Sequence, residues 1–195
     1  MDPAVPSDDL WFRSADGAFE VRLGGEAVER MLMLCHRARR LETGGVLIGQ
    51  YSSDHRVAYV EVATGPGSDS RAGSTWLLRG VRGLQNILDT FWSQKRGYYI
   101  GEWHFHPGAE PSPSRRDVAQ MQSIASSELY HCPEPLLVVI GGDAGSAPSI
   151  LVEVHTRRGQ RISLHGGSTE RHGTSNSIGP AVPSAGTSGA SKADS

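Results

Sequence analysis

Two histidines and an aspartate in the middle of the chain have the residue types and spacing of a metal site. His104 and His106 are separated by one residue, and Asp117 follows after a short loop that contains glycine and proline. Two imidazoles and a carboxylate are typical ligands of a catalytic zinc ion, whose fourth position is left for water. The pattern therefore predicts a metal-dependent hydrolase. The same ligand types also suit iron, nickel or copper, so zinc is inferred from ligand chemistry.

The histidine pair lies at the end of a predicted strand, because the residues before it are rich in aromatic and β-branched types. Side chains two residues apart on a strand share a face and lie about 6.5 to 7 Å apart along it. His104 and His106 therefore point the same way. Trp103 and Phe105 point to the opposite face, where two large rings suit a core. Pro107 ends the strand.

Asp117 lies where a helix is predicted to begin, and this allows a second interpretation. Ser114 and Asp117 match the pattern of a helix-capping pair, which is a common way for a helix to start. Glu102 also shares a strand face with His104. It is either a rival metal ligand or a carboxylate that orients an imidazole, and we favour the second.

Glu42 is the best candidate for a general base, which a metal-activated water needs as a proton acceptor. It lies between a predicted helix and a buried apolar strand, directly before a segment with two adjacent glycines, Gly44 and Gly45. Such glycines permit close approach of another backbone. The alternative is an ordinary exposed glutamate at a helix end.

These motifs together resemble the JAMM family of zinc isopeptidases, also called MPN+ or JAB. The resemblance spans most of residues 18–165 and rests on three segments in the family's order: residues 42–49, His104-x-His106-Pro107 and Ser114-x-x-Asp117. It implies a single α/β domain of the MPN/JAB, cytidine-deaminase-like type, with a curved mixed β-sheet flanked by helices.

The resemblance also implies a role for each candidate residue. Glu42 would be the general acid and base, taking a proton from water and delivering it to the leaving amine. Ser114 would stabilise the tetrahedral oxyanion, with Ser112 as a nearby competitor for that role. The expected ligands of Zn²⁺ are His104, His106 and Asp117.

The sequence around Gly101-Glu102-Trp103-His104 is similar to that of a short bacterial branch of the family, which is found in integrative elements and antiphage CBASS operons. This similarity implies cleavage after the C-terminus of a ubiquitin-like protein, or of a protein conjugated by bacterial E1-like and E2-like enzymes. A CD-NTase-type nucleotidyltransferase is a candidate partner. Two alternatives stay open: an amide hydrolase acting on a sulfur-carrier protein adduct, and a non-catalytic MPN-type binding module.

Four other residues have side chains or positions that bear on the chemistry. Phe105 replaces the serine or threonine of many relatives, but strand alternation turns it away from the metal face. His131 and Cys132 are faintly similar to a second zinc site in some deubiquitinases, although two adjacent ligands do not make a tetrahedral site. Cys35 and Cys132 lie in no cysteine-protease pattern, and Cys35 belongs to an apolar helical run, so both are expected to be packed.

Composition limits the class of protein. With 195 residues, a formal charge of -2 and a pI near 6.4, the chain gives no electrostatic reason to bind nucleic acid. No apolar run approaches the roughly 18 residues of a membrane span, and the first residues lack the features of a signal peptide. Two cysteines without framework spacing suit a reducing compartment. We therefore expect a cytoplasmic protein.

The pattern of apolar residues predicts alternating strands and helices. Strands are expected at 18–23, 45–51, 56–64, 75–78, 135–140 and 149–154, with an edge strand at 161–164. Helices are expected at 26–40, at 81–96 and after Asp117. A loop at 65–74 could border the substrate groove.

The domain plan follows from these elements. Residues 1–17 are taken as an N-terminal extension, 18–165 as the metalloprotease domain, and 166–195 as a disordered tail. The tail is rich in glycine and serine and has no aromatic residue, so it cannot bury enough surface to offset chain entropy.

Overall fold

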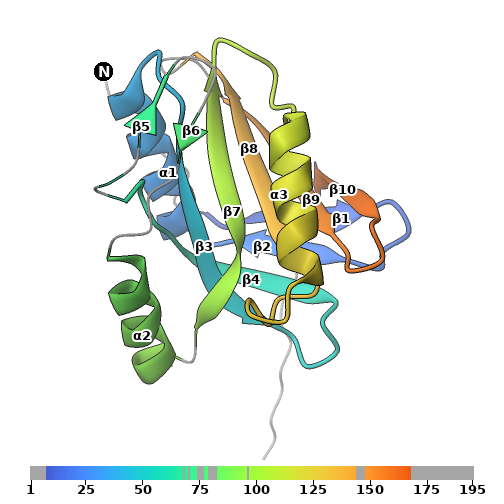
Figure 1. The fold of residues 1–195 in the computed structure, drawn as a ribbon. Helices are drawn as coiled ribbons and strands as arrows, with labels where there is room; N and C mark the ends of the chain where they lie inside the picture. Colours follow the sequence, from blue (N-terminus) through green and yellow to red (C-terminus); the bar gives the residue numbers. More distant parts are fainter. Residues whose placement is uncertain are drawn as a thin grey trace, which may run out of the picture.

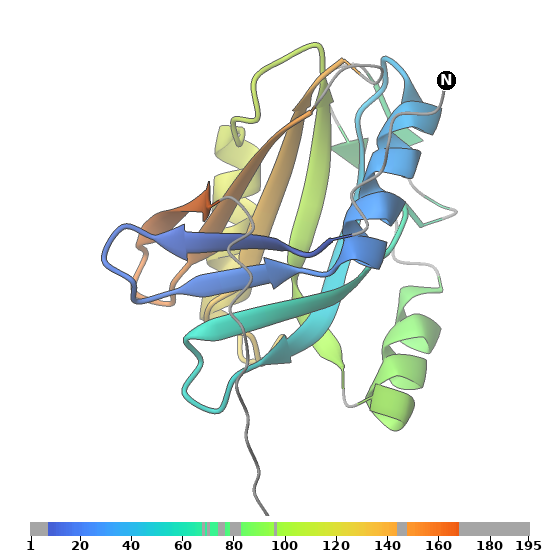
Figure 2. The ribbon, with the colours of Figure 1, turned by 180° about the vertical axis from the view of Figure 1, so that it is seen from behind.

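The fold is taken from a computed structural model, which describes residues 8–67, 69, 71–73, 77–78, 83–95, 97–143 and 148–167. Within these residues, eight strands close into a barrel in the order β1-β10-β9-β8-β7-β3-β4-β2, and helices pack around it (Figures 1 and 2). The barrel strands are β1 (Leu10–Ser14), β2 (Glu20–Leu23), β3 (Thr43–Tyr51), β4 (Val57–Ala63), β7 (Tyr98–Pro107), β8 (Leu136–Gly142), β9 (Ser149–His155) and β10 (Arg161–Gly167). The other elements are α1 (Gly25–Ala38), α2 (Leu84–Lys95), α3 (Arg115–Ser126) and a small sheet of β5 (Arg71–Ala72) with β6 (Leu77–Leu78).

The sheet is mixed, as predicted, but it is a closed barrel rather than an open curved sheet. The pairs β2–β4 and β7–β8 are parallel, and the other barrel pairs are antiparallel. Closure depends on β1, which pairs with β2 on one side and β10 on the other. The predicted edge strand, β10, is therefore paired on both sides.

The position of β1 corrects the N-terminal boundary, because this strand lies inside the 1–17 segment that the sequence assigned to an extension. Its five residues turn Phe12 and Ser14 inward and leave Trp11 39% exposed. A strand this short, with a polar side chain on its buried face and an indole outside, shows no clear apolar alternation.

Helix α1 packs against β3 and β4. Its buried residues recur at the spacing of one helical face, and they join the largest apolar cluster together with side chains from all eight barrel strands. These α1 residues are Ala27, Val28, Met31 and Cys35. Burial raises the pKa of the Cys35 thiol to about 12, which fits packing and not nucleophilic chemistry.

Helix α3 lies on the outside of the barrel, beside β8 and in front of β9 (Figure 1). Met121 and Ile124 of α3 pack there in a second cluster whose strand residues include Val46, Leu137 and Val139. The central strands are thus buried on both faces, as their long apolar runs suggest. This packing fixes α3 against the strand that carries the histidines.

Some predicted features lie at or beyond the described residues. Gly166 and Gly167 end β10, whereas the rest of the predicted tail, 168–195, lies outside the described residues. The same holds for parts of the 65–74 loop. Every helix in the described ranges is too short or too polar to reach across a bilayer.

Candidate metal centre

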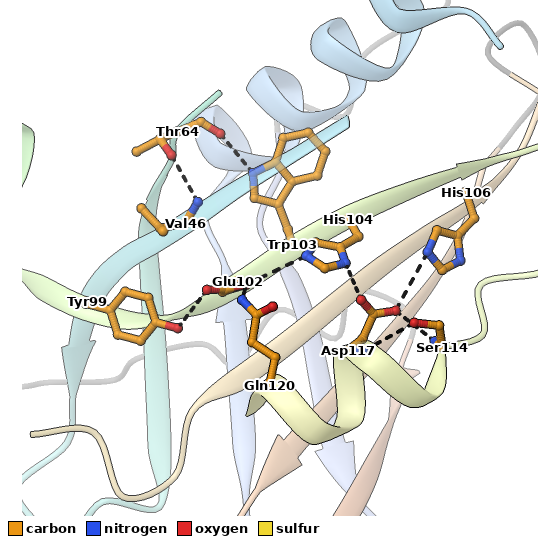
Figure 3. A network of polar contacts seen from close by, with 10 residues as sticks. All are labelled: Val46, Thr64, Tyr99, Glu102, Trp103, His104, His106, Ser114, Asp117 and Gln120. Carbon is orange, nitrogen blue, oxygen red and sulfur yellow. Dashed lines mark hydrogen bonds and ion pairs between the residues drawn. The ribbon is translucent and has the colours of Figure 1, made fainter. Parts of the chain in front are cut away.

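A β-bulge in β7 sets which side chains face α3. The register between β3 and β7 shifts between Leu47 and Ile48, and this leaves Ile100 without a partner. Ile100 consequently joins Trp103 in the barrel interior. Because of the extra residue, the side chains that precede the bulge face the opposite side of the sheet from the one that strict alternation would give. The face toward α3 therefore carries Tyr99, Glu102, His104 and His106 (Figure 3).

Three candidate ligands meet between β7 and the start of α3 (Figure 3). Nδ1 of His104 lies 3.0 Å from Oδ1 of Asp117, and Nε2 of His106 lies 4.0 Å from Oδ2 of Asp117. One ligand atom from each residue lies within 4.8 Å of the others, and within the described ranges no other such group of three occurs. Ligands around a tetrahedral zinc ion are about 3.4 Å apart. Small side-chain movements would therefore let all three bind one ion.

The electrostatics of this group suit a cation. Burial lowers the pKa of His104, but contacts with Asp117 and Glu102 outweigh burial and raise that pKa to about 9. Burial raises the pKa of Asp117, but His104 and Ser114 hold it well below its ordinary value. Asp117 is therefore ionised at neutral pH. The positive charge that this pair holds on the imidazole is the charge that a bound cation would supply.

Ser114 and Asp117 also form a complete capping box at the start of α3. The backbone N–H of Ser114 donates to Oδ2 of Asp117 at 2.7 Å, and the N–H of Asp117 donates to Oγ of Ser114 at 3.2 Å. The capping interpretation is thus realised together with the metal-site geometry. The Ser114 side chain also contacts the Asp117 carboxylate and helps to lower its pKa. Because Ser114 is exposed, its hydroxyl is accessible to a substrate.

Glu42 lies next to this group. Glu42 directly precedes Thr43, which pairs with Phe105 in the antiparallel β3–β7 register. It therefore lies at the end of β3 that is next to the histidine pair. Burial raises the pKa of Glu42, and all three candidate ligands act on its carboxylate electrostatically. The predicted base is thus a partly buried carboxylate within reach of the candidate ligands.

Contacts with Thr64 hold β3 and β7 at this position. A side chain at Gly45 would collide with the backbone of Thr64, so the predicted close approach does occur there. Thr64 in turn accepts hydrogen bonds from the backbone of Val46 and, at 2.9 Å, from Nε1 of Trp103. The indole beneath the histidine strand is therefore held by a polar contact as well as by packing.

The loops on either side of the group are also tied down. The N–H of Glu42 donates to the carbonyl of Gly73, which places this part of the 65–74 loop beside the candidate base. After the histidines, the backbones of Gly108 and Ala109 pair with Gly142 at the end of β8. Elsewhere, Cys132 is buried in the second apolar cluster, as expected for a packed residue.

A family comparison agrees with this geometry. Residues 25–154, more than half of the chain, match the family described as prokaryotic homologues of the JAB domain. The chain belongs to the prokaryotic JAB-domain family. The predicted family is therefore confirmed, and the matched range contains every candidate site residue.

Relatives of this JAB-domain chain carry hydrolase names. It is 41% identical over 157 residues, or 80% of this chain and 86% of the relative, to a protein of Enterobacter hormaechei named CD-NTase/cGAS isopeptidase. It is 31% identical to a probable metalloprotease of Sinorhizobium fredii, over 67% of this chain and 82% of that protein. An Escherichia coli protein, also named CD-NTase/cGAS isopeptidase, is 34% identical over 52% of this chain and 62% of its own length.

Two residues of the site were not predicted from the sequence. Gln120 and Tyr99 both contact Glu102, at 2.7 Å and 3.4 Å. The signal for Gln120 is its position three residues after Asp117, which places both side chains on one helix face. Tyr99 reaches the JAB-domain site because of the bulge, which the sequence pattern does not reveal.

Proposed function

We propose that this protein is a zinc-dependent JAB-type isopeptidase. Its substrate would be an amide bond after the C-terminus of a CD-NTase-type nucleotidyltransferase or ubiquitin-like protein that E1-like and E2-like enzymes have joined to an amine. The observation that carries the proposal is the meeting of two imidazoles, a carboxylate and a second, partly buried carboxylate at one place. The 41% identity to a CD-NTase/cGAS isopeptidase supports the substrate class.

In this proposal His104, His106 and Asp117 hold the zinc ion. Their donor atoms, two nitrogens and one carboxylate oxygen, are the set found in catalytic zinc sites, and their separations fit one ion after small movements. When bound, zinc lowers the pKa of a water molecule to about 7 and polarises the scissile carbonyl.

Glu42 and Ser114 complete the chemistry. Glu42 accepts the proton of the attacking water and passes it to the leaving nitrogen, because an amine leaves only after it is protonated. Burial raises the pKa of Glu42 toward neutral pH, and this favours both steps, because the group must accept a proton and then give it up. Ser114 donates a hydrogen bond to the carbonyl oxygen, where negative charge develops as water attacks the carbonyl carbon.

The same proposal assigns a place and a role. Removing what a conjugation system attaches to a nucleotidyltransferase would make the protein a regulator of antiphage defence in the cytoplasm. The cysteines Cys35 and Cys132 are both free thiols, which fits a reducing compartment.

A cleavage assay tests the proposal. The substrate is a CD-NTase-type protein whose C-terminal carboxyl is joined through an amide to a lysine-containing reporter peptide, and a ubiquitin-like protein with the same reporter is assayed in parallel. We expect release of the reporter by the native protein, loss of release with a zinc chelator, and recovery when zinc is returned.

The decisive control is the double variant His104→Ala/His106→Ala, with bound zinc measured by mass spectrometry. We expect it to bind no zinc and to cleave nothing. Undiminished cleavage by this variant would show that the proposed centre is not the catalytic one.

A further inference from the structure

Glu102 is a charged group in a place where charge is costly. The residue is fully buried, at 0% exposure, in the middle of β7. A buried carboxylate is tolerated only where other groups compensate for the water it has lost. Gln120 donates to its Oε2 at 2.7 Å, and the Tyr99 hydroxyl lies 3.4 Å from its Oε1. Neither of these partners is charged.

A candidate metal ligand also lies close to this carboxylate. Oε2 of Glu102 lies 3.7 Å from Nε2 of His104, while Nδ1 of the same ring lies 3.0 Å from Asp117 (Figure 3). The two ring nitrogens point in different directions. Glu102 therefore lies behind the imidazole as seen from Asp117, and it does not share the position of a ligand.

We propose that Glu102 is the positioning residue of His104. It keeps the ring proton on Nε2 and the ring plane fixed, so that the lone pair on Nδ1 points to the ion beside Asp117. A ligating imidazole commonly donates its other N–H to a carboxylate in this way. A movement of about 0.5 Å brings the two groups into hydrogen-bond range. The proposal rests on the proposed function only in requiring that the site binds zinc.

The arrangement of the elements supports this role. Gln120 follows Asp117 by three residues, so both lie on the face of α3 that looks at β7. One helix therefore holds a candidate ligand directly and fixes the carboxylate behind another ligand through Gln120. Tyr99 reaches the second oxygen only because of the bulge at Ile100. Two separate features of the fold thus converge on one carboxylate.

The test measures zinc affinity, not cleavage. In Glu102→Gln the side-chain shape is kept, but the amide can donate to Nε2 and so favours the proton on Nδ1, where zinc should bind. We expect the zinc dissociation constant, measured against a chromophoric chelator, to rise about 10- to 100-fold. The visible spectrum of the cobalt-substituted protein should change as well, because one ligand is displaced or misaligned.

Glu153→Gln is the matched control. Glu153 is also a buried carboxylate on a neighbouring part of the barrel, at 3% exposure, but its partners are His155 and Arg161. This variant should lose stability and keep the native zinc affinity. If Glu102→Gln behaves in the same way, Glu102 has a structural role only and the proposal is overturned.

A second variant guards against misfolding of the first. Gln120→Leu removes the hydrogen bond that fixes Glu102, and it leaves the carboxylate in place. We expect a smaller rise in the zinc dissociation constant, and unchanged affinity in this folded variant would count against the proposal. A native protein that binds zinc but cleaves no substrate would refute the proposed function, and the affinity comparison would still be valid.

Discussion

Ser114 illustrates how one side chain can serve both folding and chemistry. As the N-cap of α3 it satisfies a backbone N–H, and as an exposed hydroxyl beside the candidate ligands it can donate to an oxyanion. The two roles have different energetic consequences, because glycine replaces serine at an N-cap with little loss, whereas alanine does not. A pair of substitutions can therefore separate them.

We expect Ser114→Ala to lower the free energy of unfolding by about 1 kcal/mol and Ser114→Gly by only a few tenths. Both should lose roughly 2.7 to 4 kcal/mol of transition-state stabilisation, which is a loss of about 100- to 1,000-fold in kcat. Urea unfolding and cleavage kinetics measure the two effects. A Ser114→Gly enzyme with native kcat would restrict Ser114 to capping and direct attention to Ser112.

Glu42→Gln tests the candidate base. The amide keeps the size of the side chain but cannot accept the proton, so we expect kcat to fall about 100- to 10,000-fold while zinc content and thermal stability stay native. Loss of zinc in this variant would indicate instead that Glu42 helps to hold the ion.

The residues with a distinctive chemistry could be predicted from the sequence, whereas their supports could not. Residue type and spacing indicate a metal site at His104, His106 and Asp117, and the structure does bring these side chains together. Gln120 and Tyr99 are ordinary surface-type or core-type residues, whose contacts with Glu102 exist only in three dimensions.

Strand β7 positions the site through its bulge, and Gly101 is the residue that makes room there. A side chain at Gly101 would collide with the backbone carbonyl of Leu136 on the parallel neighbour β8. Strict alternation along β7 would have placed Ile100 beside Glu102, so the bulge marks the limit of what periodicity can predict.

We expect Gly101→Ala to destabilise the protein by about 1 to 3 kcal/mol, as overpacking does in a close-packed interior. Gly65→Ala is the control, because its added methyl group would make an ordinary contact with Leu34 at 3.5 Å. Chemical denaturation of both variants measures the difference. Equal stability of the two would mean that β7 and β8 can separate at this point without cost.

At the scale of the whole molecule, barrel closure depends on β1, which pairs with both β2 and β10. We expect a chain of residues 8–167 to unfold cooperatively and a chain of residues 18–167 to lose its fold, because removal of β1 leaves two strand edges unpaired. Circular dichroism during heating distinguishes these cases. A native-like melting transition in the shorter chain would assign residues 1–17 to an extension after all.

Glu153 links the last two strands and should make stability depend on pH. Burial raises the pKa of Glu153, but contacts with His155 and Arg161 outweigh burial and lower that pKa from 4.5 to about 2. Because the folded pKa is depressed, this stabilisation is fully present above pH 4.5 and is lost as the pH falls toward 2. The difference in unfolding free energy between the native protein and Glu153→Gln should shrink over that range. If that difference stays constant, the stabilisation by Glu153 comes from packing and not from its charge.

The capping box has a consequence for how the protein acquires its ion. Asp117 is held at the start of its own helix because its Oδ2 accepts a hydrogen bond from the backbone N–H of Ser114, a contact that involves neither histidine. Small zinc-finger domains, by contrast, stay unfolded until metal arrives. A chain synthesised while zinc is scarce would therefore fold with its carboxylate ligand already in place. When zinc returns, activity would recover at the rate of ligand exchange, without refolding of the polypeptide.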